Sequence, residues 1–192
     1  IGGLGLRMKA GILLLNMCFP VLAGLVMLLG KREYTEKELA GRSLTAMVIA
    51  ACFLVWNLTG DPLSLHLCSL GKDLPVYFHV DAIGKLFASV VTLVWILAIC
   101  FAGEYMKKEQ DQKRFFGFFL IVYGVLMGLC YAGNLITFYL FYEMMTLTTV
   151  PLVLHTRTRE AITAGMKYLL YSLSGAYMVL FSTYMLNRYT TS

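Results

Sequence analysis

The sequence predicts an all-α membrane protein of about six transmembrane helices, forming a single transmembrane domain over residues 1–192. Hydrophobic residues make up 59% of the chain. Charged residues make up 14%, against roughly 25% in an ordinary soluble domain. The mean hydropathy is +0.72. A chain of this length cannot hide so much apolar surface in a water-soluble core, so a soluble globular protein and a disordered tail are both excluded.

Six apolar runs are long enough to cross a membrane, since a span needs about 20 apolar residues for a core about 30 Å thick. We expect spans at residues 11–30, 43–58, 83–102, 115–131, 135–154 and 166–186. The first contains Pro20 and is followed by no small-residue cleavage site, so it is interpreted as a span and not as a removed signal peptide. The second is short and is expected to tilt little or to extend into its flanks.

The connection at residues 59–81 differs from the others. It alternates apolar and polar residues in LSLHLCSL, turns at GKDLP and alternates again in VYFHV. Period-two alternation around a glycine-containing turn predicts a small β-hairpin on the membrane surface between the second and third helices, with an irregular loop as the alternative. Directly after it, Asp81 and Lys85 are interpreted as an i,i+4 surface pair that anchors the third span at the interface.

The distribution of Lys and Arg predicts the orientation. The connections after the first, third and fifth spans hold ten of these residues, and the opposite side holds five. Because cytoplasmic connections carry the Lys and Arg excess, both termini and the hairpin are expected on the non-cytoplasmic side of a prokaryotic inner or plasma membrane. The net charge of +5 is therefore attributed to these connections, and nucleic acid is not an expected partner.

Motifs for soluble enzyme chemistry are not found. The sequence has no glycine-rich phosphate loop and no nucleophile elbow, and its five cysteines form no CxxC pair with metal-site spacing. We therefore expect no metal site and no bound cofactor in this chain.

Glu143 is the leading candidate for a functional residue. It lies near the middle of the fifth span, about 12 Å or more from either end at 1.5 Å per residue, too deep for a short carboxylate to reach water. An ionisable group inside a span costs several kcal/mol when unpaired and marks a functional site by default. A carboxyl that alternates between paired and unpaired surroundings takes up and releases a proton. The alternative is a structural glutamate that fixes helix packing.

Four further residues are candidates around Glu143. Lys167, early in the sixth run, either points inward as the cationic partner of the proton path or extends its stem to the interface. His155 ends the fifth span, where a histidine can relay protons. Thr146 and Thr149 follow Glu143 and can bond water in a cavity or helix carbonyls. Pro151 leaves one carbonyl without its usual donor, which suits a hydrated pocket at membrane depth.

These residues belong to a recognisable stretch. Residues 134–181 contain an Asn-Leu helix start, an aromatic run, Phe-Tyr-Glu-Met-Met and Ala-Gly-x-Lys-Tyr-Leu, and FHVDAIGKLFASVV lies upstream. This pattern resembles the antiporter-like, proton-translocating membrane subunits of respiratory complex I, of Mrp-type Na⁺/H⁺ antiporters and of energy-converting hydrogenases. The resemblance covers roughly residues 60–186. It implies that Glu143 is the family's buried fifth-helix glutamate, that Lys167 is a basic residue of the sixth helix, and that the N-terminus faces away from the cytoplasm.

Members of that family are longer, with about fourteen helices in two inverted repeats that contain broken helices. We interpret the chain as a fragment, an incompletely recorded chain or a split subunit completed by another chain, and expect membrane partners that include further antiporter-like subunits. The resemblance favours translocation of H⁺ or Na⁺ in a complex I-like respiratory or hydrogenase complex, as a subunit of an ion-translocating oxidoreductase without a redox centre of its own. The alternatives are a subunit of an Mrp-type antiporter and a structural membrane subunit that transports nothing.

Overall fold

The computed structural model describes residues 2–31, 34–60, 63–69, 75–108, 111–155 and 158–190. Within them lie six helices that are long and apolar enough to cross a membrane. In chain order the elements are α1 (Gly2–Leu29), α2 (Glu36–Thr59), β1 (Leu63–Ser69), β2 (Pro75–Val80), α3 (Ala82–Tyr105), η1 (Met106–Lys108), α4 (Gln112–Cys130), α5 (Leu135–Val153) and α6 (Arg159–Thr190). The predicted all-α membrane fold with a small β-hairpin is confirmed.

Three helices begin well before their apolar runs. Helix α1 begins at Gly2, α2 at Glu36 and α6 at Arg159, all before the predicted spans. Capping groups explain two of these starts: the Thr35 N–H donates to Glu38 at 3.1 Å, and the Thr158 hydroxyl accepts from the Ala161 N–H at 3.1 Å. Charged residues that favour helix carry the backbone past the apolar segment, and hydropathy alone does not detect such extensions.

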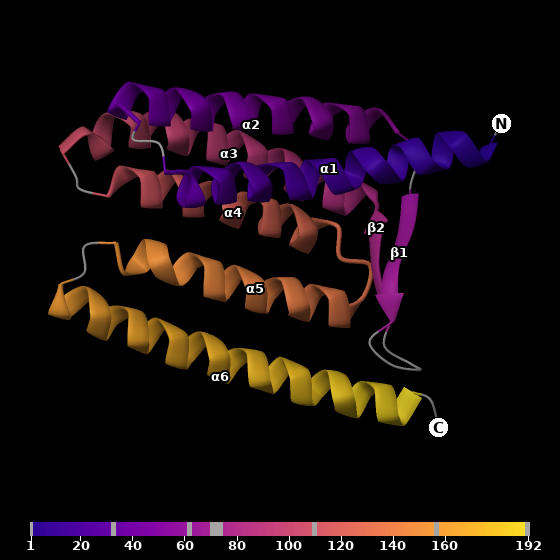
Figure 1. Cartoon of the computed structure of the whole chain (residues 1–192). Coiled ribbons are helices and arrows are strands. Elements are labelled where there is room, and N and C mark those ends of the chain that lie inside the picture. The colour runs from indigo at the N-terminus through magenta and orange to yellow at the C-terminus, as the bar shows by residue number, and fades with distance from the viewer. Residues whose placement is uncertain are drawn as a thin grey trace.

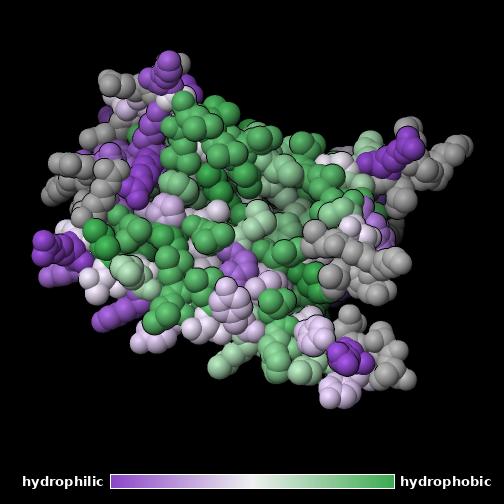
Figure 2. Space-filling view, turned by 60° about the horizontal axis from the view of Figure 1, so that its bottom comes forward, coloured by the Kyte–Doolittle hydropathy of each residue, from purple (hydrophilic) through white to green (hydrophobic). Residues whose placement is uncertain are grey.

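The helices lie side by side with roughly aligned axes (Figure 1). Helix α4 lies at the centre and packs against α1, α5, α2 and α3, whereas α6 packs mainly against α5. The connections α1–α2, α3–α4 and α5–α6 gather at one end, here called the loop end (Figure 1). Both termini and the β-hairpin gather at the other, the hairpin end. A space-filling view shows a broad hydrophobic surface between more hydrophilic ends, as a membrane-embedded chain requires (Figure 2).

The β-hairpin at the hairpin end consists of two paired strands. Strands β1 and β2 pair antiparallel, with Leu63 opposite Val80 and Leu65 opposite Phe78, and the register shifts between His66 and Cys68. The Phe78 side chain is fully buried. The predicted turn at GKDLP falls largely on residues 71–74, which lie outside the described residues.

Asp81 and Lys85 do not act as the expected surface pair. The Asp81 carboxylate caps α3 by accepting the Gly84 N–H at 2.6 Å. The Lys85 ammonium donates to the carbonyls of Gly60 at 2.6 Å and Leu58 at 3.3 Å, at the end of α2. Helix C-terminal carbonyls attract cations, so Lys85 joins α2 to α3 and is not paired with Asp81.

Candidate functional site

The start of α5 is fixed by the hairpin. The Asn134 side chain accepts the Thr137 N–H at 2.8 Å and donates to the Pro75 carbonyl at 2.6 Å. The Thr137 hydroxyl accepts the Tyr77 N–H at 3.2 Å. These bonds satisfy groups that a helix start leaves open. They also set the depth of α5 relative to β2, and thereby the depth of every side chain further along α5.

Glu143 lies near the middle of α5 and is half-buried within this chain. Tyr139, one turn earlier, lies close enough to interact with its carboxyl, and Tyr177 of α6 lies close enough to interact with Tyr139. The other acids in the membrane-crossing helices, such as Glu104 and Glu160, lie within the last or first turn. Glu143 is therefore the one carboxyl at mid-membrane depth among the described residues.

A row of hydroxyl groups joins α5 to α6. The Thr149 hydroxyl lies 2.9 Å from the Tyr168 hydroxyl, and the Thr146 hydroxyl lies 3.0 Å from that of Ser172. The Tyr142 hydroxyl lies 3.5 Å from Ser172. We call Tyr142, Thr146, Thr149, Tyr168 and Ser172 the hydroxyl cluster. The Thr146 and Thr149 hydroxyls also contact the Tyr142 and Thr146 carbonyls, at 3.2 Å and 2.9 Å. A hydroxyl can donate and accept hydrogen bonds, so these groups, joined by water, can pass a proton.

The hydroxyl cluster has a definite extent and direction. From Thr149 to Tyr142 it covers about 10 Å of α5 at 1.5 Å per residue. Its residues on α5 begin about one turn inside the loop end and finish at Tyr142, which precedes Glu143 in the chain. Thr146 is 1% exposed, so the middle of the row is shielded by protein. Polar groups in an apolar helix pair thus lie between one membrane face and the half-buried carboxyl of Glu143.

Two family models match segments of the chain. A family model described as "NADH:quinone oxidoreductase/Mrp antiporter, TM" matches residues 132–192, which include α5 and α6. A second, "NADH-Ubiquinone oxidoreductase (complex I), chain 5 N-terminus", matches residues 68–116. The two matched segments follow one another in the chain and together cover more than half of it. The chain belongs to the antiporter-like membrane subunit family.

Relatives of this antiporter-like protein occur in several kinds of complex. It is 31% identical over 114 residues to a Na(+)/H(+) antiporter subunit of Alkalihalophilus pseudofirmus, covering 58% of this chain and 14% of that one. It is 24% identical over 111 residues to the chloroplastic NAD(P)H-quinone oxidoreductase subunit 5 of Liriodendron tulipifera, covering 56% of this chain and 15% of that one. The matches thus span about a seventh of each relative's length.

A solved structure has the same fold. A chain of the membrane-bound sulfane sulfur reductase, described as an archaeal respiratory membrane complex, superposes with a TM-score of 0.73 at 22% identity, over 96% of this chain and 28% of that one. The antiporter-like chain is thus an integral membrane protein whose relatives are subunits of multi-subunit membrane complexes.

The predicted site residues are only partly brought together. Thr146 and Thr149 lie in the hydroxyl cluster, one helix turn or more from Glu143 on the same helix. Lys167 is exposed on α6, and no ion pair joins it to Glu143 among the described residues. Because Thr149 pairs with Tyr168, Lys167 lies near the loop end of the cluster, about 11 Å along the axis from the level of Glu143 at 1.5 Å per residue.

His155 lies just beyond α5, at the loop end. Its ring stands edge-on to Phe115 with ring centroids 5.7 Å apart. Its Nδ1 atom is buried and has no hydrogen-bond partner within the described residues. A histidine held this way offers one ring nitrogen to a water molecule or to a neighbouring chain. Pro151 lies inside α5, and its own carbonyl accepts from Arg114 at 3.3 Å.

Sequence reasoning missed the α6 half of the site and a second buried polar residue. Tyr168 and Ser172 are four residues apart, as are Tyr142 and Thr146, and this helical spacing is the signal that the sequence offers. Asn16 of α1 is fully buried beside the Tyr131 hydroxyl, outside hydrogen-bonding geometry. Among the described residues, no three His, Cys, Asp or Glu side chains gather closely enough to hold a metal ion.

Proposed function

We propose that this chain carries part of an ion-translocation path, with H⁺ as the ion and Glu143 as its exchanging group. The observation that carries the proposal is the hydroxyl cluster, whose two groups, Thr149 with Tyr168 and Thr146 with Ser172 and Tyr142, lie along the α5–α6 contact between the loop end and Glu143. Protons pass along hydroxyls and intervening water, whereas Na⁺ needs several oxygen ligands around one point. A row of single hydroxyl contacts suits the proton better.

The proposed path runs as follows. Water at the loop end, near His155, delivers a proton to Thr149 and Tyr168. Water carries it on to Thr146, Ser172 and Tyr142, and further water bridges the last step to Glu143. Lys167, near the loop end of the path, sets the electrostatic potential for proton entry. Uptake and release at Glu143 follow from a change in its charged surroundings, which other subunits supply.

The chain acts within a multi-subunit membrane complex in this proposal. Its α6 carries many exposed apolar side chains, including Met166, Leu170, Met178 and Phe181. Such a helix needs lipid or further helices around it. A redox complex of the complex I or hydrogenase type and an Mrp-type antiporter both supply such neighbours. The 31% identity to a Na(+)/H(+) antiporter protein favours the antiporter as the second candidate.

The identity of co-purifying chains separates the two candidates. Iron–sulfur or nickel subunits isolated with the chain from native membranes would indicate a redox pump. Several similar membrane chains without metal-containing partners would indicate an antiporter. We propose a prokaryotic plasma membrane as the location, with the hairpin end outside.

Orientation is tested with a natural cysteine. Cys68 is exposed on β1, so a membrane-impermeant maleimide should label it from outside intact cells. A Lys107→Cys variant places the control thiol in η1 at the loop end, where labelling should require opened cells. The reverse labelling pattern would overturn the orientation.

The decisive test of function is Glu143→Gln, which keeps size and most hydrogen bonding but removes titration. Proton uptake into vesicles that carry the whole assembly should fall at least about a hundredfold, the lower range for a positioned acid–base group. Glu143→Asp should retain part of it. Glu160→Gln, a change of an exposed acid at the start of α6, is the matched control and should transport normally. Full transport by an assembled Glu143→Gln complex would instead favour a structural, non-transporting role.

A further inference from the structure

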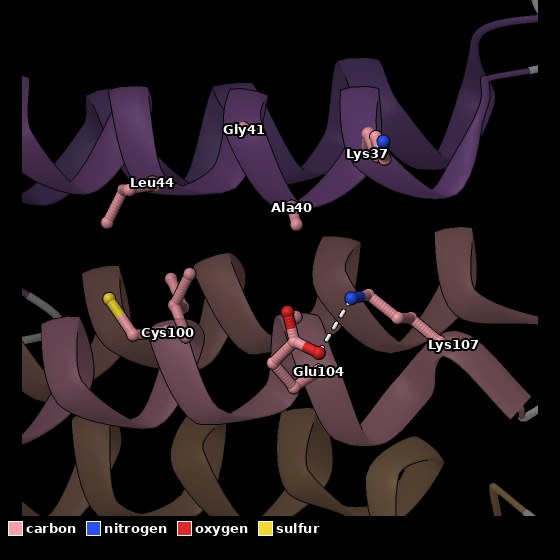
Figure 3. A pocket seen from close by; sticks show the side chains of 9 residues that line it. Lys37, Ala40, Gly41, Leu44, Cys100, Glu104 and Lys107 are labelled. Carbon is pink, nitrogen blue, oxygen red and sulfur yellow. Dashed lines mark hydrogen bonds and ion pairs between the residues drawn. The ribbon is translucent and has the colours of Figure 1, made fainter.

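A pocket of about 390 Å³ lies between α2 and α3 at the loop end, far from the hydroxyl cluster (Figure 3). Its lining is divided by character. Lys37 of α2, Glu104 of α3 and Lys107 of η1 supply the charged part, and Leu44 of α2 and Cys100 of α3 supply the apolar part. In Figure 3 the charged and apolar groups lie at opposite ends of the pocket.

Both lysines have ammonium N–H groups that can bind an anion. The Lys107 ammonium donates to Glu104 at 2.6 Å, which occupies one of its three N–H groups. Lys37 is exposed, and within the described residues it forms no ion pair. The charged lining carries two positive charges and one negative charge, so the pocket attracts an anion.

Gly41 also lines the pocket, and a Cβ atom placed on it would meet no heavy atom within 4 Å. The pocket volume of about 390 Å³ leaves room beside Leu44 and Cys100 for part of a hydrocarbon chain. A free phosphate ion would gain nothing from this part of the pocket, whereas a lipid gains the burial of its chain in a protein groove.

We propose that this pocket binds an anionic phospholipid, with the phosphate between Lys37 and Lys107 and an acyl chain along Leu44 and Cys100. The membrane supplies the ligand. This step rests on the proposed orientation, in which the loop end faces the cytoplasmic leaflet, where anionic lipids concentrate. The proposal does not depend on proton translocation, because none of these residues belongs to the hydroxyl cluster.

The test titrates the full chain in mild detergent with phosphatidylglycerol, phosphatidylcholine or inorganic phosphate and counts bound molecules by native mass spectrometry. Phosphatidylglycerol should bind most tightly. Lys37→Gln combined with Lys107→Gln should weaken its binding about 30-fold, which corresponds to about 2 kcal/mol. Glu104→Gln should strengthen it about fivefold, because it removes the repelling carboxylate. Lys31→Gln combined with Arg159→Gln removes the same charge elsewhere at the loop end and should change phosphatidylglycerol binding little.

A second pair of variants tests the acyl chain. Gly41→Leu fills the groove and should abolish tight phosphatidylglycerol binding, while Gly11→Leu, also in open space, should not. Circular dichroism checks that each variant is folded. Three results would overturn the proposal. Phosphatidylcholine binds as tightly as phosphatidylglycerol, the double lysine variant binds phosphatidylglycerol as tightly as the wild type, or Glu104→Gln weakens the binding. Unchanged binding in Gly41→Leu with competition by inorganic phosphate would mean a simple anion site and would also overturn it.

Discussion

The α1–α4 contact and the α5–α6 contact are both helix pairs in the same chain, yet they are built differently. Of the most apolar window of α4, 56% is buried, against 11% for α5 and for α6. Close backbone approach joins α1 to α4: a Cβ on Gly124 would lie 2.5 Å from the Met17 carbonyl oxygen. Hydroxyl pairs join α5 to α6. The first pair is packed for stability, and the second keeps polar groups and open surface at membrane depth.

The difference indicates that the two helix pairs have different roles. In a membrane, helices associate through close packing of small residues and through interhelical hydrogen bonds. The α1–α4 pair uses the first and provides a fixed frame. The α5–α6 pair uses the second, and its bonds can exchange partners with water during a proton transfer. We therefore expect substitutions in the two regions to affect different measurements.

The largest effect on stability is expected for Gly124→Ala. The added methyl group meets backbone of α1 at a distance that no Cβ tolerates, so the helices must separate. Overpacking of this kind costs about 1–3 kcal/mol. Unfolding in mixed micelles titrated with sodium dodecyl sulfate measures it.

Gly11→Ala is the control for this change, since a Cβ there meets nothing within 4 Å. It should be neutral or stabilising by up to about 1 kcal/mol, because alanine favours helix. Equal stability of the Gly124→Ala and Gly11→Ala variants would show that α1 and α4 do not approach so closely.

Tyr123→Phe should have an intermediate effect. The buried Tyr123 hydroxyl lies 2.9 Å from that of Thr92, joining α4 to α3. Thr92 keeps its bond to the Ala88 carbonyl at 2.7 Å, so only one interaction is lost. The expected cost is about 0.5–1 kcal/mol. Proton transport per folded complex should stay at the wild-type level. A transport defect in this variant, with normal stability, would mean that the proton path runs between α3 and α4 and not between α5 and α6.

Lys85→Met should have the smallest effect. It removes the ammonium from the carbonyls of Gly60 and Leu58 but keeps a similar stem. A cation at a helix C-terminus contributes about 0.3–1 kcal/mol, and salt screens it. The loss should therefore shrink at high salt, and Lys85→Arg should restore most of it. A loss of stability that is the same at low and high salt would mean that the stem of Lys85, and not its charge, stabilises the junction of α2 and α3.

Much of the fold follows from the sequence because the membrane sets the helix length. All six spans and the hairpin are predictable from apolar runs and period-two alternation. The helix starts at Gly2, Glu36 and Arg159 are not, since capping and helix propensity extend a helix beyond its apolar run. The depth of Glu143 is predictable from residue counting alone.

The rest of the site depends on packing. Which face of α6 meets α5 is decided by neighbouring helices, and the apolar residues of α6 occur on several faces. Tyr168 and Ser172 therefore could not be assigned to Thr149 and Thr146 before the helices were placed. The distance between Lys167 and Glu143 depends on the same register, which the sequence does not contain.

The central claim is that the hydroxyl cluster conducts protons. Its most direct test is proton uptake by vesicles carrying the assembled complex, with Thr146→Val combined with Ser172→Ala, against Thr92→Val combined with Tyr123→Phe. Both double variants remove two hydroxyls from a helix–helix contact. The account predicts that the first loses at least about tenfold in transport rate per folded complex, and that the second keeps its rate per folded complex, with the stability of each variant measured separately. Wild-type transport in the first variant, or a rate loss confined to the second, would contradict it.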